Sequence, residues 1–162
     1  AYLSPEMKST GEAIGYDRTM TRALYKALQA AGMRVQNYGT VLATIADRDK
    51  PEALELIRRF YNLGFNIEAT SGTAKFLKAN GIRTHALKKI SDGSEEIPNA
   101  LRQGHIAYVI NTKDPGVSEQ DGAEIRRIAT EHNVTLFTAL DTIKVLLDVL
   151  EETTLTISTI DA

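Results

Sequence analysis

The sequence contains no cysteine among its 162 residues. This absence excludes a disulfide framework, a cysteine-ligated zinc site and a catalytic thiol. Histidine is scarce too: His85, His105 and His132 lie far apart and match no metal-ligand spacing. We therefore expect no metal site.

Long apolar runs, strong net charge and two nucleotide-binding motifs are also missing. No apolar stretch approaches the ~20 residues of a membrane span, and no signal-peptide pattern opens the chain, so we expect a cytoplasmic protein with no membrane partner. The formal net charge of −2 lacks the basic excess of nucleic-acid-binding domains, so no nucleic-acid partner is expected. Without GxGxxG after the first strand or GxxxxGK[ST], neither a Rossmann dinucleotide site nor a P-loop is supported.

The remaining composition is that of a soluble globular protein, with 43% hydrophobic and 25% charged residues. Because the chain lacks an initiator Met and opens inside what resembles a motif, we expect a fragment. Residues 1–38, with loop signals followed by an amphipathic helix from Asp17 to Gly32, are predicted to be a linker and helix from a preceding region. Residues 39–162 are predicted to form the main domain, whose tail from Thr153 could add an edge strand or cover a helix.

Strand and helix patterns alternate regularly along this main domain. Strands are predicted at Val41–Ala46, Asn66–Ala69, Arg83–Leu87, Ala107–Asn111 and Val134–Phe137. Helices are predicted from Asp49 to Gly64, at Thr73–Asn80 and Ile97–Gln103, after a Ser118 cap, and at Asp141–Glu151. Such alternation is typical of a three-layer α/β/α fold with a five-stranded parallel sheet, which is Rossmann-like, and right-handed crossovers.

The stretch Asn66–Leu77 combines a short strand, a tight turn and a helix start. In that geometry the backbone N–H groups of Ser71–Ala74 would point out of the sheet end, where a helix N-terminus attracts phosphate. The hydroxyls of Thr70, Ser71 and Thr73 would add donors. An ordinary turn, with Ser71 or Thr73 as helix cap and Gly72 for backbone freedom, explains this stretch equally well.

Polar residues follow the other predicted strands as well. They are Asp47–Lys50 after the first, Lys88 and Lys89 after the third, Asn111–Lys113 after the fourth, and Thr138 after the fifth. Ligands of parallel sheets bind at the carboxyl ends of the strands, and this inventory suits a phosphorylated ligand. Lys50 could instead be solvated, and Lys88 and Lys89 could pair with the following acidic loop. Asp49 is better explained as a helix cap, so we assign no catalytic residue.

Several segments resemble a known family. GTVLATIADRDK, FNIEATSGTAKFL and AYVINTK, preceded by SPEMKSTGEAIGYDRT, are similar to the C-terminal end of the carbamoyl phosphate synthetase large subunit. PEMKSTGE resembles the close of its second ATP-grasp region, and the rest resembles its regulatory domain of methylglyoxal-synthase-like fold. The resemblance covers nearly the whole chain and weakens from Thr153.

The resemblance implies an allosteric domain that binds a nucleotide-type effector such as UMP, IMP or phosphoribosyl pyrophosphate and regulates carbamoyl phosphate synthesis for the pyrimidine and arginine pathways. Position by position, it places the effector site on Thr44, Lys50, Thr70, Thr73, Lys89 and Asn111. Together with the turn residues Ser71 and Gly72 and with Lys113, these form our predicted site. The implied partners are the rest of the large subunit and the glutaminase small subunit; ATP and Mg or K ions serve the parent enzyme, and no cofactor is expected here.

Two departures from the family pattern matter. Lys113 replaces a threonine and could alter ligand preference, while Leu136 replaces a tyrosine of an ornithine site that also uses Thr138, so we expect no ornithine binding. The loop KKISDGSEEI lacks the glycine-rich, aspartate-bearing pattern of methylglyoxal synthase, so this chain is predicted not to be an enzyme.

The alternative is a stand-alone methylglyoxal-synthase-like lyase or a nucleotide cyclohydrolase-like enzyme. A docking module without ligand is a third hypothesis, and self-association through Leu24 and Leu28 is also predicted.

Overall fold

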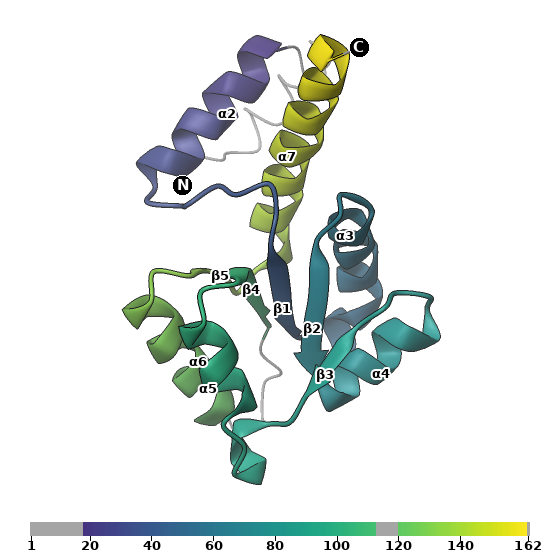
Figure 1. The fold of residues 1–162 in the computed structure, drawn as a ribbon, viewed down its shortest axis with the longest axis vertical. Coiled ribbons are helices and arrows are strands. Elements are labelled where there is room, and N and C mark those ends of the chain that lie inside the picture. The colour runs from purple at the N-terminus through teal and green to yellow at the C-terminus, as the bar shows by residue number, and fades with distance from the viewer. Residues whose placement is uncertain (1–17, 113–119, 162) are drawn as a thin grey trace. The chain divides into compact units, whose positions relative to one another are not determined.

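The computed structural model describes residues 18–112 and 120–161, so Ser118 and Lys113 lie outside the described residues. Its contacts divide the chain into two compact units (Figure 1). One comprises residues 36–144 and holds the sheet; the other comprises residues 1–35 and 145–162. The predicted boundary after residue 38 stays a prediction.

The first unit is built on a parallel sheet of five strands. They are β1 (Thr40–Thr44), β2 (Asn66–Thr70), β3 (His85–Leu87), β4 (Ile106–Asn111) and β5 (Thr135–Phe137). Their order is β3-β2-β1-β4-β5, and every neighbouring pair is parallel. The predicted fold class is therefore confirmed. The chain steps outward from β1 to β3 and then returns to the other side of β1, which places a reversal of strand order between β1 and β4.

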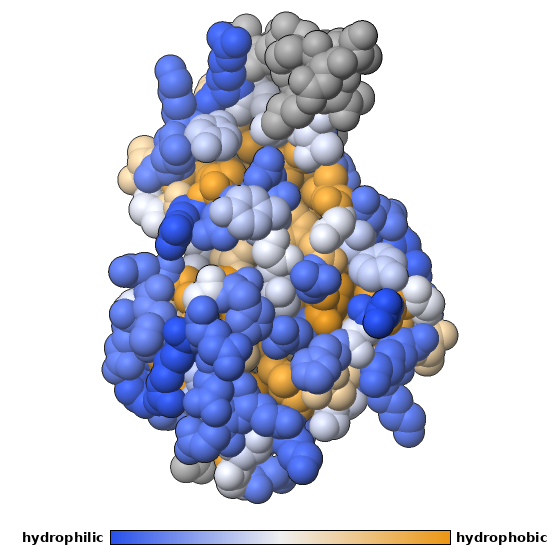
Figure 2. Space-filling view, in the orientation of Figure 1, coloured by the Kyte–Doolittle hydropathy of each residue, from blue (hydrophilic) through white to orange (hydrophobic). Residues whose placement is uncertain are grey.

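Helices cover both faces of this sheet. On one face lie α3 (Lys50–Asn62) and α4 (Ser71–Ala79); on the other lie α5 (Glu96–Arg102) and α6 (Gln120–Glu131) (Figure 1). Short 3₁₀ turns, η1 (Asp47–Asp49) and η2 (Ile90–Asp92), follow β1 and β3. Figure 2 shows a mostly hydrophilic surface over α5 and α6. The polar sides of these helices therefore face outward, as an amphipathic pattern requires.

Alternating side chains of the strands fill two apolar layers. Leu42 and Val109 belong to a buried cluster with α5 and α6, whose other members include Ile97, Leu101, Ile106, Ile125 and Ile128. Tyr108 is fully buried, and its ring lies near Phe60, Phe65 and Phe137 at centroid distances of 5.8–6.0 Å. Its hydroxyl donates to the Gln36 carbonyl and accepts from the Gln36 N–H, both at 2.6 Å. These layers hold the sheet rigid beneath the strand ends.

The structure decides one alternative that the sequence left open and corrects one prediction. The tail from Thr153 adds no strand, because α7 runs from Leu140 to Asp161 without interruption. Asp49 occupies the N-cap position of α3 but makes no side-chain capping bond. Its backbone angles, φ −92° and ψ −10°, belong to the preceding 3₁₀ turn, whereas a capping side chain needs an extended backbone.

The second unit contains α2 (Arg18–Ala30) and the part of α7 from Val145 onward. Leu24 and Leu28 are 7% and 0% exposed, so both leucines of α2 are already buried within a single chain. Self-association stays a prediction, and it no longer follows from an exposed apolar face. Of the helices in residues 18–112 and 120–161, none is long and apolar enough to cross a membrane.

Candidate functional site

The carboxyl ends of β1, β2, β3 and β4 lie along one edge of the sheet, which we call the strand-end rim. Strand register aligns Thr44 with Asn111, and Thr70 with Leu87, the residue before Lys88 and Lys89. The parallel sheet therefore brings most of the predicted site residues to the same edge.

Two threonine hydroxyls hydrogen-bond to the segment after β1 and connect it to α4 and to the segment after β4. The N–H of Ile45 donates to Thr73 Oγ1 at 3.1 Å, and the N–H of Ala46 donates to Thr112 Oγ1 at 2.8 Å. Thr73 lies in α4 after β2, and Thr112 follows β4. Each hydroxyl retains its own proton as a donor. The residues singled out as ligand contacts thus also have a structural role that the sequence did not reveal.

The first turn of α4 lacks a side-chain cap. Thr70 is the N-cap residue, in extended conformation (φ −63°, ψ 156°), and its side chain makes no capping hydrogen bond. The alternative of a turn capped by Ser71 or Thr73 is therefore wrong. The first backbone N–H groups of a helix have no partner within it, so those of α4 remain available to an anion.

Access to this helix end is uneven. Thr70 and Thr73 are only 6% and 3% exposed, whereas Ser71 and Gly72 face the solvent. A Cβ atom built on Gly72 would meet nothing within 4 Å. An incoming phosphate would therefore meet the backbone of Ser71 and Gly72 first, with the threonine hydroxyls behind it.

Lys50 begins α3 and is paired within its own chain. Its ammonium group forms a hydrogen-bonded ion pair with Asp47 of η1. Lys50 is 17% exposed and Asp47 is 86% exposed, so the pair sits at the surface with its lysine side covered. The hydrogen bond from Lys50, then its charge and more weakly that of Lys89, lower the pKa of Asp47 below 3.8. Asp47 is therefore a carboxylate at neutral pH.

The two lysines after β3 do not form the ion pairs that the sequence allowed. Both are exposed, and within the described part of the chain neither side chain pairs with Asp92, Glu95 or Glu96. Instead the backbone N–H of Lys88 donates to Glu96 Oε2 at 2.5 Å. Because Lys89 contributes to the lowered pKa of Asp47, its charge acts on the same part of the rim as Lys50.

Asn111 ends β4 in a crowded position. It is 4% exposed, and its Nδ2 donates a long hydrogen bond of 3.4 Å to the Gly122 carbonyl in α6. A Cβ on Gly122 would come within 3.1 Å of that Nδ2, so this helix position must stay small for Asn111 to keep its place. Sequence reasoning missed Gly122, since a glycine inside a helix pattern carries no sign of such a contact.

Four further positions that the sequence analysis named lie elsewhere. Lys113 lies outside the described residues. Thr138, after β5, is exposed and lines a cavity together with Thr112, apart from the α4 helix end. His85 is exposed in β3, and His105 Nε2 lies 3.0 Å from Glu68 Oε2. Within the described ranges, no three side chains of the metal-binding types gather at one place.

Replacing Thr73 with valine tests its structural role. The change removes the acceptor of the Ile45 N–H in a buried position, and we expect the free energy of unfolding to fall by about 1–3 kcal/mol. Thr73→Ser keeps the oxygen and should stay close to wild type. Urea unfolding measures both, and equal stabilities of the valine and serine variants would contradict the assignment.

Comparison with known families defines the class of this protein. Residues 52–138, more than half of the chain, match the family model of the MGS-like domain. The chain therefore belongs to the MGS-like domain family. Among solved structures it matches methylglyoxal synthase from Elizabethkingia anophelis NUHP1, with a TM-score of 0.58 and 17% sequence identity, over 70% of this chain and 79% of that one. At this identity the likeness establishes a shared fold.

One prediction is corrected by this comparison. From the sequence we expected that the chain is not an enzyme, because the loop KKISDGSEEI differs from that of methylglyoxal synthase. That prediction is wrong as drawn: the solved structure that the chain matches is an enzyme, and the family bears that enzyme's name. One divergent loop does not separate the chain from its catalytic relatives.

Proposed function

We propose that the strand-end rim binds the phosphate group of a small phosphorylated metabolite. The observation that carries this proposal is the first turn of α4, which has no side-chain cap and stands at the end of β2. Its backbone N–H groups and the positive end of the helix dipole favour an anion. Lys50 and Lys89 supply charge, and Thr44, Thr70, Thr73 and Asn111 line the same edge.

The comparisons support a lyase more strongly than any other use of such a site. We propose that the chain acts on a triose phosphate in the manner of methylglyoxal synthase. In that elimination a base removes a proton from the carbon beside the carbonyl, and the bond from carbon to the phosphate oxygen breaks. The phosphate leaves with the electron pair, and the enol product becomes methylglyoxal. Asp47 is the candidate base by position, because it lies beside Lys50 at the strand-end rim. Lys50 and Lys89 hold its pKa below the usual value, which keeps it ionised but makes it a weaker base than an isolated carboxylate.

The assay for this proposal is the release of inorganic phosphate and methylglyoxal from dihydroxyacetone phosphate by the purified chain. We expect the two products in equal amounts, and Asp47→Asn should abolish their release. Calorimetric binding of the substrate without either product would rule out the lyase while leaving the phosphate site in place.

A specific observation favours a second candidate, an effector-binding domain of a carbamoyl phosphate synthetase. The segments GTVLATIADRDK and NIEATSGTAKFL, which supply β1, η1, β2 and the start of α4, resemble that family's regulatory domain. In this function UMP, IMP or phosphoribosyl pyrophosphate binds the rim and shifts an equilibrium between domain arrangements. Regulation of the pyrimidine and arginine pathways, and a cytoplasmic site of action, would follow from it.

Calorimetry separates the two candidates. Tight binding of a nucleotide or of phosphoribosyl pyrophosphate, with no turnover of triose phosphate, would favour the effector domain, and conversion of a purine nucleotide would indicate the cyclohydrolase-like alternative. For whichever phosphate ligand binds, Lys89→Ala should weaken binding by about 1–3 kcal/mol, the value of a hydrogen bond to a charged group. An unchanged affinity would remove Lys89 from the site.

A further inference from the structure

A second candidate site lies at the other side of the sheet's carboxyl edge. A cavity of about 480 Å³ opens there, and its lining includes Asp49, Glu52, Thr112, Arg126, Thr138 and Asp141. These residues come from η1 and α3, from the segments after β4 and β5, and from α6 and α7. The volume is within the range of small-molecule sites. None of the residues predicted for the phosphate site lines this cavity.

Arg126 is the feature of this cavity that calls for a ligand. Its Nη1 atom is buried, and within the part of the chain that the structure describes it has no hydrogen-bond partner. A guanidinium is always charged and carries five N–H donors, so leaving one of them buried without an acceptor is costly. Gly122, one turn earlier in α6, leaves this nitrogen room: a Cβ there would lie 3.4 Å from Nη1.

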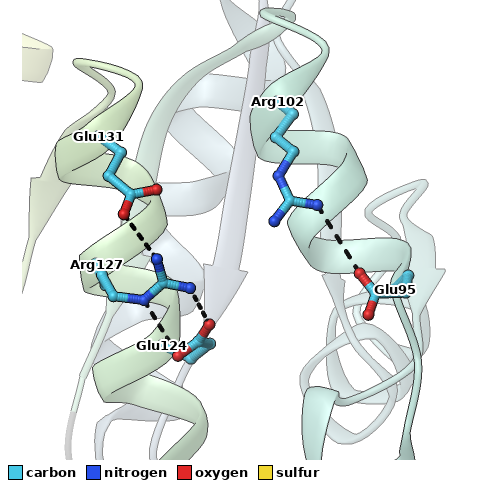
Figure 3. A network of polar contacts seen from close by, with 5 residues as sticks. All are labelled: Glu95, Arg102, Glu124, Arg127 and Glu131. Atoms are coloured by element: carbon cyan, nitrogen blue, oxygen red, sulfur yellow. Dashed lines mark hydrogen bonds and ion pairs between the residues drawn. The ribbon is translucent and has the colours of Figure 1, made fainter.

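The neighbouring Arg127 shows the usual arrangement on the same helix. Its guanidinium is about half exposed and bonds both Glu124 and Glu131, at 2.7 Å for Glu131 (Figure 3). These contacts hold the pKa of Glu124 below its usual value. The two adjacent arginines therefore differ: Arg127 is exposed and satisfied by carboxylates, whereas Arg126 lines a cavity and has one buried nitrogen without a partner among the described residues.

The carboxylates around the cavity are engaged elsewhere. Lys144 Nζ lies 2.9 Å from Glu52 Oε1 and 3.7 Å from Asp141 Oδ1, and Asp49 lies 4.0 Å from the Arg48 side chain. Arg48 also lines the cavity, so two arginines stand against the three carboxylates Asp49, Glu52 and Asp141. The resulting excess of one negative charge disfavours a multiply charged anion such as a phosphate dianion. A single carboxylate suits Arg126 better, because its two oxygens match the guanidinium fork.

The rest of the lining indicates what such a ligand carries at its other end. Thr112 Oγ1 accepts from the Ala46 N–H, so its own proton is free to donate to a ligand oxygen. Asp49 and Asp141 lie 4.0 Å and 3.7 Å from their cations, beyond hydrogen-bond distance, so their oxygens can still accept hydrogen bonds from hydroxyl groups on a ligand. We propose that this cavity binds a small monocarboxylate bearing hydroxyl groups, with its carboxylate on the guanidinium of Arg126.

The test uses the whole chain and gluconate, a hydroxylated monocarboxylate, as the probe. Thermal unfolding is followed at increasing gluconate, with ionic strength held constant by sodium chloride. We expect gluconate to raise the Tm of wild type and of the matched control Arg127→Gln, and to leave the Tm of Arg126→Met unchanged. Direct titration should show at least a tenfold weaker Kd for Arg126→Met. An equal shift in Arg126→Met, or none in wild type, would overturn the proposal.

Two further measurements keep the result unambiguous. If Arg126→Met fails to fold, NMR of the Arg126 Nε–H in the wild-type chain serves instead, and a gluconate-dependent shift there, with Arg127 unaffected, is the expected result. Inorganic phosphate at the same ionic strength should move neither the Arg126 signal nor the gluconate Kd; an equal response to phosphate would refute the carboxylate assignment. Lys89→Ala should not alter gluconate binding. A failure of the carboxylate proposal can therefore be distinguished from a failure of the phosphate site at the strand-end rim.

Discussion

Tyr108→Ala is expected to lower the free energy of unfolding by about 3–5 kcal/mol, the range for truncating a buried aromatic residue. Tyr108 is fully buried in the central region of the sheet, with three phenylalanine rings within 6.0 Å. No neighbour can fill the space without moving a strand. Urea unfolding followed by circular dichroism measures the change, with Tyr38→Ala as control, because Tyr38 is 74% exposed and its loss should matter little.

Tyr108→Phe separates the ring from the hydroxyl. It keeps the packing but leaves the Gln36 N–H and carbonyl without the Tyr108 oxygen, so we expect a loss of about 1–3 kcal/mol. The phenylalanine variant should therefore lie between wild type and alanine. A phenylalanine variant as unstable as the alanine variant would mean that the ring contributes nothing by packing, contrary to its complete burial.

The second large effect concerns ligand binding at Lys50. Lys50→Ala is expected to lower the affinity for a phosphate ligand by about 10- to 100-fold, which corresponds to about 1.5–3 kcal/mol for a charged hydrogen bond. Asp47→Asn should act in the opposite direction, because it releases Lys50 from the carboxylate that occupies it. Calorimetry with the best phosphate ligand measures both. Lys78→Ala, in the last turn of α4, is the matched control and should leave the affinity unchanged.

The ion pair between Lys50 and Asp47 also determines how stability and ligand binding depend on pH. Lys50 lowers the pKa of Asp47 below 3.8, so any stability from the pair is fully present above about pH 3.8. It is lost only as the pH falls through the lower pKa of the folded state. Above about pH 7.5 a phosphate monoester, whose second pKa is about 6, is fully a dianion, and the charge on Asp47 is constant as well. Asp47→Asn should therefore tighten ligand binding by the same factor from about pH 7.5 to 9. A tightening that varied across it would contradict the assignment.

The sheet could be predicted from the sequence because its signals are local. Val41–Ala46 and Ala107–Asn111 are short apolar runs between turn formers, and the helices between strands show apolar spacing of three and four residues. These patterns predicted all five strands within a few residues. The edge at which the site residues meet then followed from parallel topology alone, since parallel strands end on one side.

Features that depend on turn geometry could not be predicted. Asp49-x-x-Glu52 reads as a capping pattern, yet the 3₁₀ turn before α3 rotates Asp49 away and lets Asp47 reach Lys50 instead. The conformation of the tail could not be decided from the sequence for another reason. Alternating Leu155 and Ile157 allowed either an edge strand or a segment that covers a helix. The helix begun at Leu140 continues through them, because adding residues to an existing helix is easier than starting a new element.

Arg126 was missed because two adjacent arginines look alike in a sequence. Successive helix positions are about 100° apart, so of Arg126 and Arg127 one turns toward the cavity and the other toward solvent. Ile125 and Ile128, both buried, show which side of α6 faces the sheet, but they do not reveal the cavity at its end. Only the packing of β4, β5 and α7 around that end does so.

The hydrogen bonds that Thr73 and Thr112 accept from the segment after β1 have a practical consequence for mutagenesis. They hold the consecutive amides of Ile45 and Ala46, and Thr73 belongs to the strand-end rim whereas Thr112 lines the cavity of Arg126. Both regions thus share one short piece of backbone. Removing either hydroxyl will therefore disturb both sites at once, and variants that lack it cannot assign a ligand to one of them. Lys89 and Arg126 hold no amide of that segment, and a double-mutant cycle between them would measure how strongly the two sites influence each other.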